Sequence, residues 1–218
     1  MSENDMTSGN ETTLAAGAPA PERSHTLTDD DRALIAEVLE RRLSEELDPE
    51  DVALVQRQLG RFPRGMVAVG ARCVCGTPLA VITRPLVEGR IPFPTTCYLT
   101  SPEAVKAVSH VEAAGDMAMY TKQVQEDDQV GAAYARAHAL YLEFRHRLAA
   151  RLGDDESHIL GTSAGGMPVR VKCLHALLGQ TLVMGRGVNP IGDEVLERIR
   201  DEFDPTVCRC AIRRGTTD

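Results

Sequence analysis

A long run of apolar residues at helical spacing constrains this chain most. Between Asp127 and Gly153, apolar side chains recur every three or four residues, which is the period of one helical face. The residues of this stripe are Val130, Tyr134, Ala137, Tyr141, Phe144, Leu148 and Leu152. The spacing predicts that the longest helix of the protein covers this segment.

Three further helices are expected where a capping side chain precedes a proline suited to the first helical turn. These pairs are Asp48-Pro49, Ser101-Pro102 and Asn189-Pro190, and the first two helices are expected to stop at Gly60 and Gly115. Another helix is predicted from about Thr28 to Glu46, because the acidic run after Thr28 suits a helix N-terminus.

Strand-like segments occupy the middle of the chain, at residues 66–72, 79–83 and 95–99. They are separated by segments that contain glycine or proline, as expected for short connections between strands. The fold class predicted is therefore α+β, helix-rich overall, with a small antiparallel sheet wrapped by several helices.

The domain organisation follows from length and composition. A chain of 218 residues that is 43% hydrophobic can bury one good core. Residues 1–25 hold few large apolar side chains and are expected to form a disordered acidic tail. Residues 26–204 are predicted to form a single α+β domain, and residues 205–218 a flexible C-terminal tail.

The charge pattern argues against two classes of partner. The formal net charge is −8, with few aromatic residues and no tryptophan, so a nucleic-acid partner is not expected. No hydrophobic run is long enough to cross a membrane, and the first residues lack the pattern of a signal peptide. We expect a cytoplasmic protein, in which the six cysteines are free thiols, metal ligands or redox groups.

The segment from Gly161 to His175 is the strongest candidate for a site. Gly165 and Gly166 permit backbone angles that other residues avoid, and Arg170 and Lys172 add positive charge beside them. One interpretation is a cradle for an anion, and the other is a plain junction between a loop and a helix. The segment matches neither of the common phosphate-binding glycine motifs.

Cys173 and His175 are candidate catalytic or metal-binding residues. Two residues at this separation on a regular helix point roughly 200° apart, which disfavours a direct pair between them. A third candidate is Cys73, which follows Arg72, and the pair expected on this basis is Cys73 with His175. Cys208 and Cys210 are expected to have no role at the site.

Two further sets of residues complete the candidate site. Arg61, Arg64 and Arg72 could hold a phosphate or a carboxylate together with the glycine segment. Soft metal ligands are also abundant enough for zinc or an iron–sulfur cluster, although the spacing identifies neither. The metal-ligand candidates are Cys73, Cys75, Cys97, Cys173 and His175.

Five separated motifs resemble, in order, the bacterial domain-of-unknown-function family 501. They are RxPRG at 61–65, RCxxGxP at 72–78, PFPTxxYLTxP at 92–102, SAGGMPxRVKCLH at 163–175 and GVNPxGDE at 187–194. The resemblance covers about residues 51–200. It implies a cytoplasmic protein common in actinobacteria, often encoded near a cell-division initiator protein and an exopolyphosphatase.

The resemblance also implies that the thiol and imidazole pattern of the family falls on Cys73, Cys173 and His175. Relatives often carry Cys or His where this chain has Ser101, so a four-ligand metal site here needs a substitute such as Cys75 or Cys97.

Two hypotheses for the function come from these residues. The first is a polar pocket of cysteine, histidine and arginine that binds a small anionic ligand, with a thiol-dependent enzyme as its catalytic form. The second is a non-catalytic interaction module that binds a partner protein, carries a structural metal such as zinc, and is linked to cell division or polyphosphate metabolism.

Overall fold

The predicted long helix is present and bounds one side of the fold. In the computed structural model, which describes residues 23–214, it is α5 (Asp128–Leu152), and it begins after the cap residue Asp127 and ends at the left-handed Gly153. Its inward face carries Tyr134, Tyr141 and Phe144, all fully buried. The apolar period read from the sequence therefore identified both the helix and its buried face.

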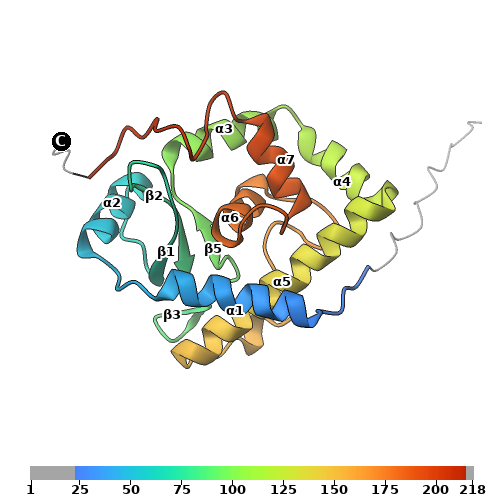
Figure 1. Cartoon of the computed structure of the whole chain (residues 1–218), viewed down its shortest axis with the longest axis horizontal. Helices are drawn as coiled ribbons and strands as arrows, with labels where there is room; N and C mark the ends of the chain where they lie inside the picture. Colours follow the sequence, from blue (N-terminus) through green and yellow to red (C-terminus); the bar gives the residue numbers. More distant parts are fainter. Residues whose placement is uncertain (1–22, 215–218) are drawn as a thin grey trace, which may run out of the picture.

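The other elements follow in chain order. They are α1 (Asp29–Leu43), α2 (Pro49–Leu59), β1 (Met66–Arg72), β2 (Pro78–Thr83), β3 (Leu86–Val87), β4 (Ile91–Pro92), β5 (Cys97–Leu99), α3 (Pro102–Ala113), α4 (Asp116–Glu126), a 3-10 turn (Ser157–Ile159), α6 (Leu174–Met184) and α7 (Pro190–Arg198). All three prolines that the sequence placed at helix starts occupy the first helical position. The protein is α+β and helix-rich, as predicted (Figure 1).

Two small antiparallel sheets carry the strands. The larger has the order β1-β2-β5, with Val69 opposite Val81 and Val81 opposite Tyr98. The smaller pairs β3 with β4 in the connection between β2 and β5. Every residue of β2 is buried, because this strand is central in its sheet and is covered by helices.

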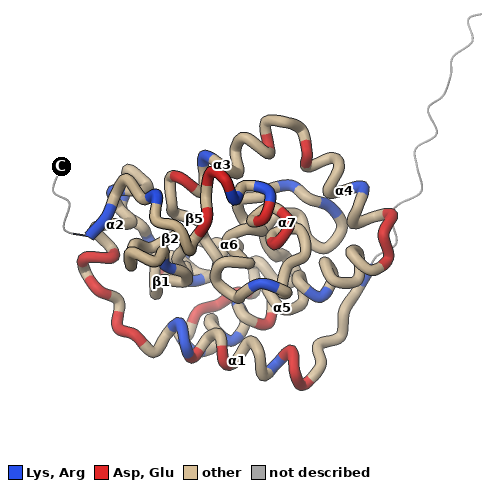
Figure 2. The backbone as a smooth tube through the Cα atoms, turned by 45° about the horizontal axis from the view of Figure 1, so that its top comes forward, with Lys and Arg blue, Asp and Glu red and all other residues tan. Residues whose placement is uncertain are grey.

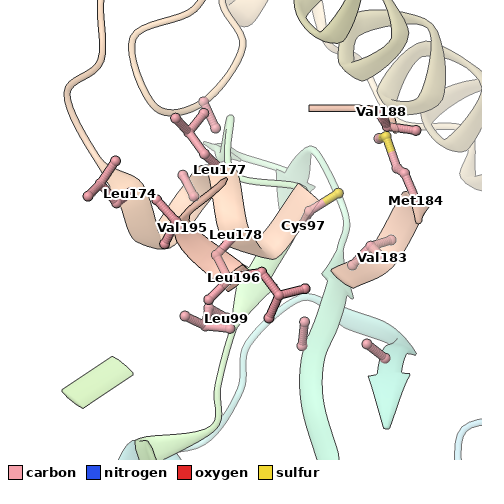
Figure 3. Packing of buried hydrophobic residues seen from close by; sticks show 14 of the residues in the cluster. Cys97, Leu99, Leu174, Leu177, Leu178, Val183, Met184, Val188, Val195 and Leu196 are labelled. Carbon is pink, nitrogen blue, oxygen red and sulfur yellow. The ribbon is translucent and has the colours of Figure 1, made fainter. Parts of the chain in front are cut away.

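The helix α6 forms the centre of the fold. Nine of its eleven residues are buried, since it packs against the sheet on one side and against α7 on the other. Leu177 and Leu178 of α6 belong to the same buried apolar cluster as Cys97 and Leu99 of β5 (Figure 3). A helix that is apolar on nearly all sides is typical of such a central position.

Close backbone approach between α6 and β5 depends on Gly179. A Cβ atom added there would lie 2.6 Å from the carbonyl oxygen of Cys97, which is backbone and cannot turn aside. Helix propensity alone would make Gly179→Ala stabilising by up to about 1 kcal/mol. We expect the opposite sign, a loss of about 2 kcal/mol in the free energy of unfolding, because overpacking a core typically costs ~1–3 kcal/mol. Urea denaturation of the two proteins measures the difference, and a stabilised variant would contradict the packing described here.

Candidate functional site

The thiol Cys173 lies at the N-terminal end of α6 and not within the helix. Its backbone is extended, with φ −153° and ψ 108°, and α6 begins only at Leu174. The sequence analysis treated Cys173 and His175 as two residues of one regular helix, which would turn their side chains apart. That expectation was wrong, because residues 168–173 form no helix, so the side chain of Cys173 is free to approach that of His175.

Glu112 of α3 completes a group of three side chains. The Sγ atom of Cys173, a ring nitrogen of His175 and a carboxylate oxygen of Glu112 all lie within 4.8 Å of one another. His175 Nδ1 lies 3.1 Å from Glu112 Oε1, and His175 Nε2 lies 3.1 Å from the carbonyl oxygen of Val105. Both ring nitrogens therefore face acceptors, which favours the doubly protonated imidazolium.

The protonation of the pair follows from these contacts. The hydrogen bond with Cys173, supported by Glu112 and Val105 against the effect of burial, raises the pKa of His175 to about 9. The hydrogen bond with His175 in turn lowers the pKa of the Cys173 thiol, and the backbone N–H of Ala176 adds to this effect. A helix N-terminus also favours negative charge, so the arrangement stabilises a thiolate beside an imidazolium.

Hydrogen bonds hold the Glu112 carboxylate in place. Its Oε1 atom accepts a hydrogen bond of 2.7 Å from the backbone N–H of Leu174, the first residue of α6. The same oxygen contacts His175, so one carboxylate joins the helix start to the imidazole. Sequence reasoning missed Glu112, because nothing in its local pattern on α3 distinguishes it from an ordinary exposed helical glutamate.

The glycine segment lies directly beside this group. Gly165 and Gly166 have φ values of +70° and +92°, and a Cβ at Gly165 would meet the side chain of Leu177 in α6 at 2.5 Å. The segment folds back on itself, since Lys172 N donates to Gly165 O at 2.7 Å and Arg170 N donates to Gly166 O at 3.2 Å. Arg170 and Lys172 are exposed in this folded-back loop, which leads directly into Cys173.

A second cluster consists of four cysteines. The Sγ atoms of Cys73, Cys75, Cys208 and Cys210 all lie within 4.8 Å of one another, and none of the four forms a disulfide. Cys73 therefore neighbours Cys208 and Cys210, for which no role was expected, and it is not grouped with His175. The overlooked signal was the repeated spacing, because Cys73-Val74-Cys75 and Cys208-Arg209-Cys210 are both CxC.

The four thiols of this cluster differ in acidity. Burial raises the pKa values of Cys73 and Cys210. Burial also acts to raise that of Cys75, but hydrogen bonds with Thr77 and with the neighbouring cysteines outweigh it and bring the pKa to about 6. Cys75, whose side chain is exposed, therefore ionises at a lower pH than Cys73 and Cys210.

The other candidate residues lie elsewhere. Cys97 is fully buried in β5, where burial raises the pKa of its thiol, and it belongs to neither group. Arg61 donates to the Tyr98 hydroxyl at 3.3 Å, and Arg64 forms an ion pair of 3.6 Å with Glu88. The predicted single pocket of thiols, imidazole and arginines is thus divided among separate places.

Arg72 lines a cavity of about 740 Å³ between α1, the sheet and α7. Other arginines of this cavity are Arg41, Arg42, Arg186 and Arg200. Each already has an acceptor, either a carboxylate or, for Arg42, the Val183 carbonyl oxygen. The cavity lining holds five arginines against three acidic residues, Glu45, Glu197 and Asp204.

The donor types of the two groups bear on metal binding. Four thiolates form a common zinc set. The sulfur, nitrogen and oxygen atoms of Cys173, His175 and Glu112 are also donor types that zinc accepts.

Comparison with known proteins identifies the family but adds no activity. A family model described as a protein of unknown function (DUF501) matches residues 69–197. No curated protein and no solved structure matches the chain. Within residues 23–214, no helix combines the length and the apolar character needed to cross a membrane.

Proposed function

Since the chain belongs to the DUF501 family, whose description assigns no activity, we propose from its geometry a thiol-dependent enzyme that acts at Cys173 on a small anionic substrate. One observation carries the proposal: a thiol at a helix N-terminus lies within 4.8 Å of an imidazole and a carboxylate. Nucleophilic cysteines are activated in such surroundings. The proposal places the protein in a reducing compartment, for which we propose the cytoplasm.

The chemistry assigned to the site is covalent catalysis at an acyl carbon. The Cys173 thiolate forms a bond to the carbonyl carbon of the substrate. The bond between that carbon and the leaving group then breaks, and His175 gives its proton to the leaving group. Water then attacks the thioester while His175 takes up a proton, which releases the carboxylic acid and restores the thiolate and the imidazolium. Glu112 orients the imidazole and stabilises its charge in both steps.

The anionic character of the substrate rests on the two cations beside the thiol. Arg170 and Lys172 are exposed, and among the described residues neither has an ion-pair partner. Most other arginines of the described chain have acidic partners, for example Arg72 with Asp51 and Arg84 with Asp154. Unpaired cations in the loop that leads to a nucleophile favour a substrate that carries a carboxylate or a phosphate.

We would test the proposal with two alkylating reagents that differ in charge, mapping each modified cysteine by peptide mass spectrometry. Cys173 should react faster at pH 7 than an unperturbed thiol. Replacing both Arg170 and Lys172 by glutamine should lower the ratio of the iodoacetate rate to the iodoacetamide rate at Cys173 about threefold, since an exposed charge contact is worth up to ~1 kcal/mol.

Arg90→Gln provides the control for this experiment, because Arg90 is an exposed arginine in the β3–β4 turn. The ratio should stay unchanged in this variant, and in the double variant the loss should shrink at high salt. A Cys173 that reacts no faster than an ordinary thiol contradicts the enzyme proposal. An unchanged ratio in the double variant contradicts the anionic substrate.

A non-catalytic interaction module with a structural metal is the second candidate function. The observation that favours it is the four-cysteine cluster, which lies apart from Cys173. The two proposals involve different residues, so each can be tested without the other.

A further inference from the structure

We propose that Cys73, Cys75, Cys208 and Cys210 bind one zinc ion, which fastens the C-terminal segment 204–214 to the turn between β1 and β2. All four Sγ atoms lie within 4.8 Å of one another. Zinc–sulfur bonds of about 2.3 Å in a tetrahedron place the sulfurs about 3.8 Å apart. Small side-chain rotations therefore bring the four thiols to the geometry of a structural zinc site.

The backbone of the β1–β2 turn is arranged to present two ligands together. Cys73 O accepts from Gly76 N at 2.8 Å, and Cys73 N donates to Thr77 O at 2.9 Å. Gly76 has a φ of +86°, which an L-residue rarely adopts, so the glycine after the second cysteine makes the turn. Thr77 Oγ1 lies 3.2 Å from Cys75 Sγ, where its hydroxyl can donate to a bound thiolate.

The second ligand pair comes from a segment that packs on this turn. Val74, which lies between Cys73 and Cys75, donates its backbone N–H to Pro205 O at 3.2 Å, and this bond joins the turn to the chain just before Cys208. Figure 1 shows the C-terminal segment, in red, leaving α7 and running across the sheet toward α2. Two ligands from a tight turn and two from a distant segment are a common arrangement in structural zinc sites.

The surrounding charges suit the bound form. One zinc ion with four thiolates carries a net charge of −2, and four arginines flank the cysteines in sequence. They are Arg72, Arg209, Arg213 and Arg214. Arg213 Nε donates to Cys210 O at 2.5 Å, so one of these cations contacts the ligand segment directly.

One carboxylate fixes both ligand segments to the same helix. Asp51 of α2 is buried, and it binds Arg72 at 2.7 Å on one side and Arg214 at 2.7 Å on the other. Figure 2 shows the basic end of the C-terminal segment beside α2. Arg72 precedes Cys73, and Arg214 follows Cys210. Asp51 therefore holds the chain at both ends of the proposed site.

A metal would add to the polar contacts that hold this segment, which has little apolar packing of its own. Residues 204–214 contain one isolated bridge, between Asp204 and Val207, and few of their side chains are buried. An irregular segment with so little apolar contact gains order from metal ligation. Pro205 and Thr206 also line the 740 Å³ cavity, so the ion would fix one wall of that cavity.

A single ion fits better than the alternative uses of four cysteines. An iron–sulfur cluster places several iron and sulfide atoms among its ligands, which spreads the cysteine sulfurs further apart than one ion does. A disulfide needs a sulfur–sulfur bond of about 2 Å, and the described structure forms none among these residues.

The test is the metal content of the full chain, purified without affinity metal or chelator under anaerobic conditions. We expect about one zinc per chain in the wild type, and less than a tenth of that in Cys75→Ser and in Cys208→Ser. Cys173→Ser is the matched control and should keep its zinc. Circular dichroism of each variant reports whether it remains folded.

A second measurement covers the case in which the serine variants fail to fold. A chelator added to the wild type should expose Cys73, Cys75, Cys208 and Cys210 to alkylation together, and should open the chain to trypsin after Arg209. The proposal is overturned if the wild type holds no zinc, if it holds iron in its place, or if zinc is lost from Cys173→Ser and kept in Cys75→Ser. It is also overturned if the chelator leaves the reactivity of the four thiols unchanged.

Discussion

Replacing Arg145 by methionine should lower the free energy of unfolding by about 3–5 kcal/mol, because one partner of a buried ion pair is removed. Arg145 is only 1% exposed, and its Nε donates to Glu156 Oε2 at 3.0 Å. Its other nitrogens donate to the carbonyl oxygens of Ile159 and Thr162. Methionine fills much of the volume but leaves one carboxylate and two carbonyls without this donor.

The large loss in the free energy of unfolding should be specific to the buried Arg145 and should not occur at an exposed arginine of the same helix. Arg147→Met makes the same substitution two residues later on α5, where the side chain is about one third exposed and pairs with Glu143. We expect this control to change the free energy of unfolding by less than about 1 kcal/mol. Urea denaturation measures both, and a loss below about 1 kcal/mol in Arg145→Met would contradict the role assigned to the buried pair.

A double variant separates the charge from the packing. If the uncompensated Glu156 carboxylate causes most of the loss, adding Glu156→Gln to Arg145→Met should restore part of the stability. The loop that Arg145 holds continues to Ser163, which contacts His138 at 2.8 Å, and then into the glycine segment. Arg145 thus anchors the chain that leads to the candidate site.

Local signals predicted the helices and strands well, for a physical reason. A cap such as Asp48 before Pro49 acts on the next turn of the chain, and its effect depends little on the rest of the fold. The three strands of the main sheet were found for the same reason, since β-branched and apolar runs bounded by turn residues depend on nearby sequence. The α4 helix was missed, because its start at Gly115 has no side-chain cap.

The candidate site was harder to predict, because its geometry depends on where a helix starts and on distant contacts. Cys173 was treated as part of a regular helix, but α6 begins only at Leu174, and the extended backbone of Cys173 lets its side chain approach His175. Glu112 and the pair Cys208 and Cys210 come from distant parts of the chain. A single sequence carries no direct record of such pairings.

Replacing His175 by asparagine should slow the alkylation of Cys173 at pH 7 about tenfold. In the wild type, the hydrogen bond with His175 lowers the pKa of the thiol, so the thiolate persists at pH values below the ordinary range. Without the imidazolium, the pKa of Cys173 should return toward its usual value near 8.5, at which only a few per cent is ionised at pH 7. Higher intrinsic nucleophilicity of the more basic thiolate offsets part of this loss.

The pH dependence of the alkylation rate provides the sharper measurement. Its expected shape follows from the lowered pKa of Cys173 and the raised pKa of His175. The lowered pKa of the Cys173 thiol means that the wild-type rate reaches its plateau at a lower pH than the rate of an ordinary thiol, and falls as the pH drops through that pKa. The imidazolium, with a pKa of about 9, stays charged across the same range. In His175→Asn the rate should instead keep rising up to about pH 9, so the two profiles converge in alkaline solution.

A histidine on the adjacent helix provides the control for this profile. His110→Asn replaces an exposed histidine on α3 that pairs with Glu202 and takes no part in the group around Cys173. Its profile should match the wild type. If His175→Asn also matches the wild type, the proximity of thiol and imidazole has no chemical consequence, and Cys173 serves the packing at the start of α6. If the profile moves to higher pH in His175→Asn and not in His110→Asn, the position of Cys173 at the start of α6, beside His175, stabilises its thiolate.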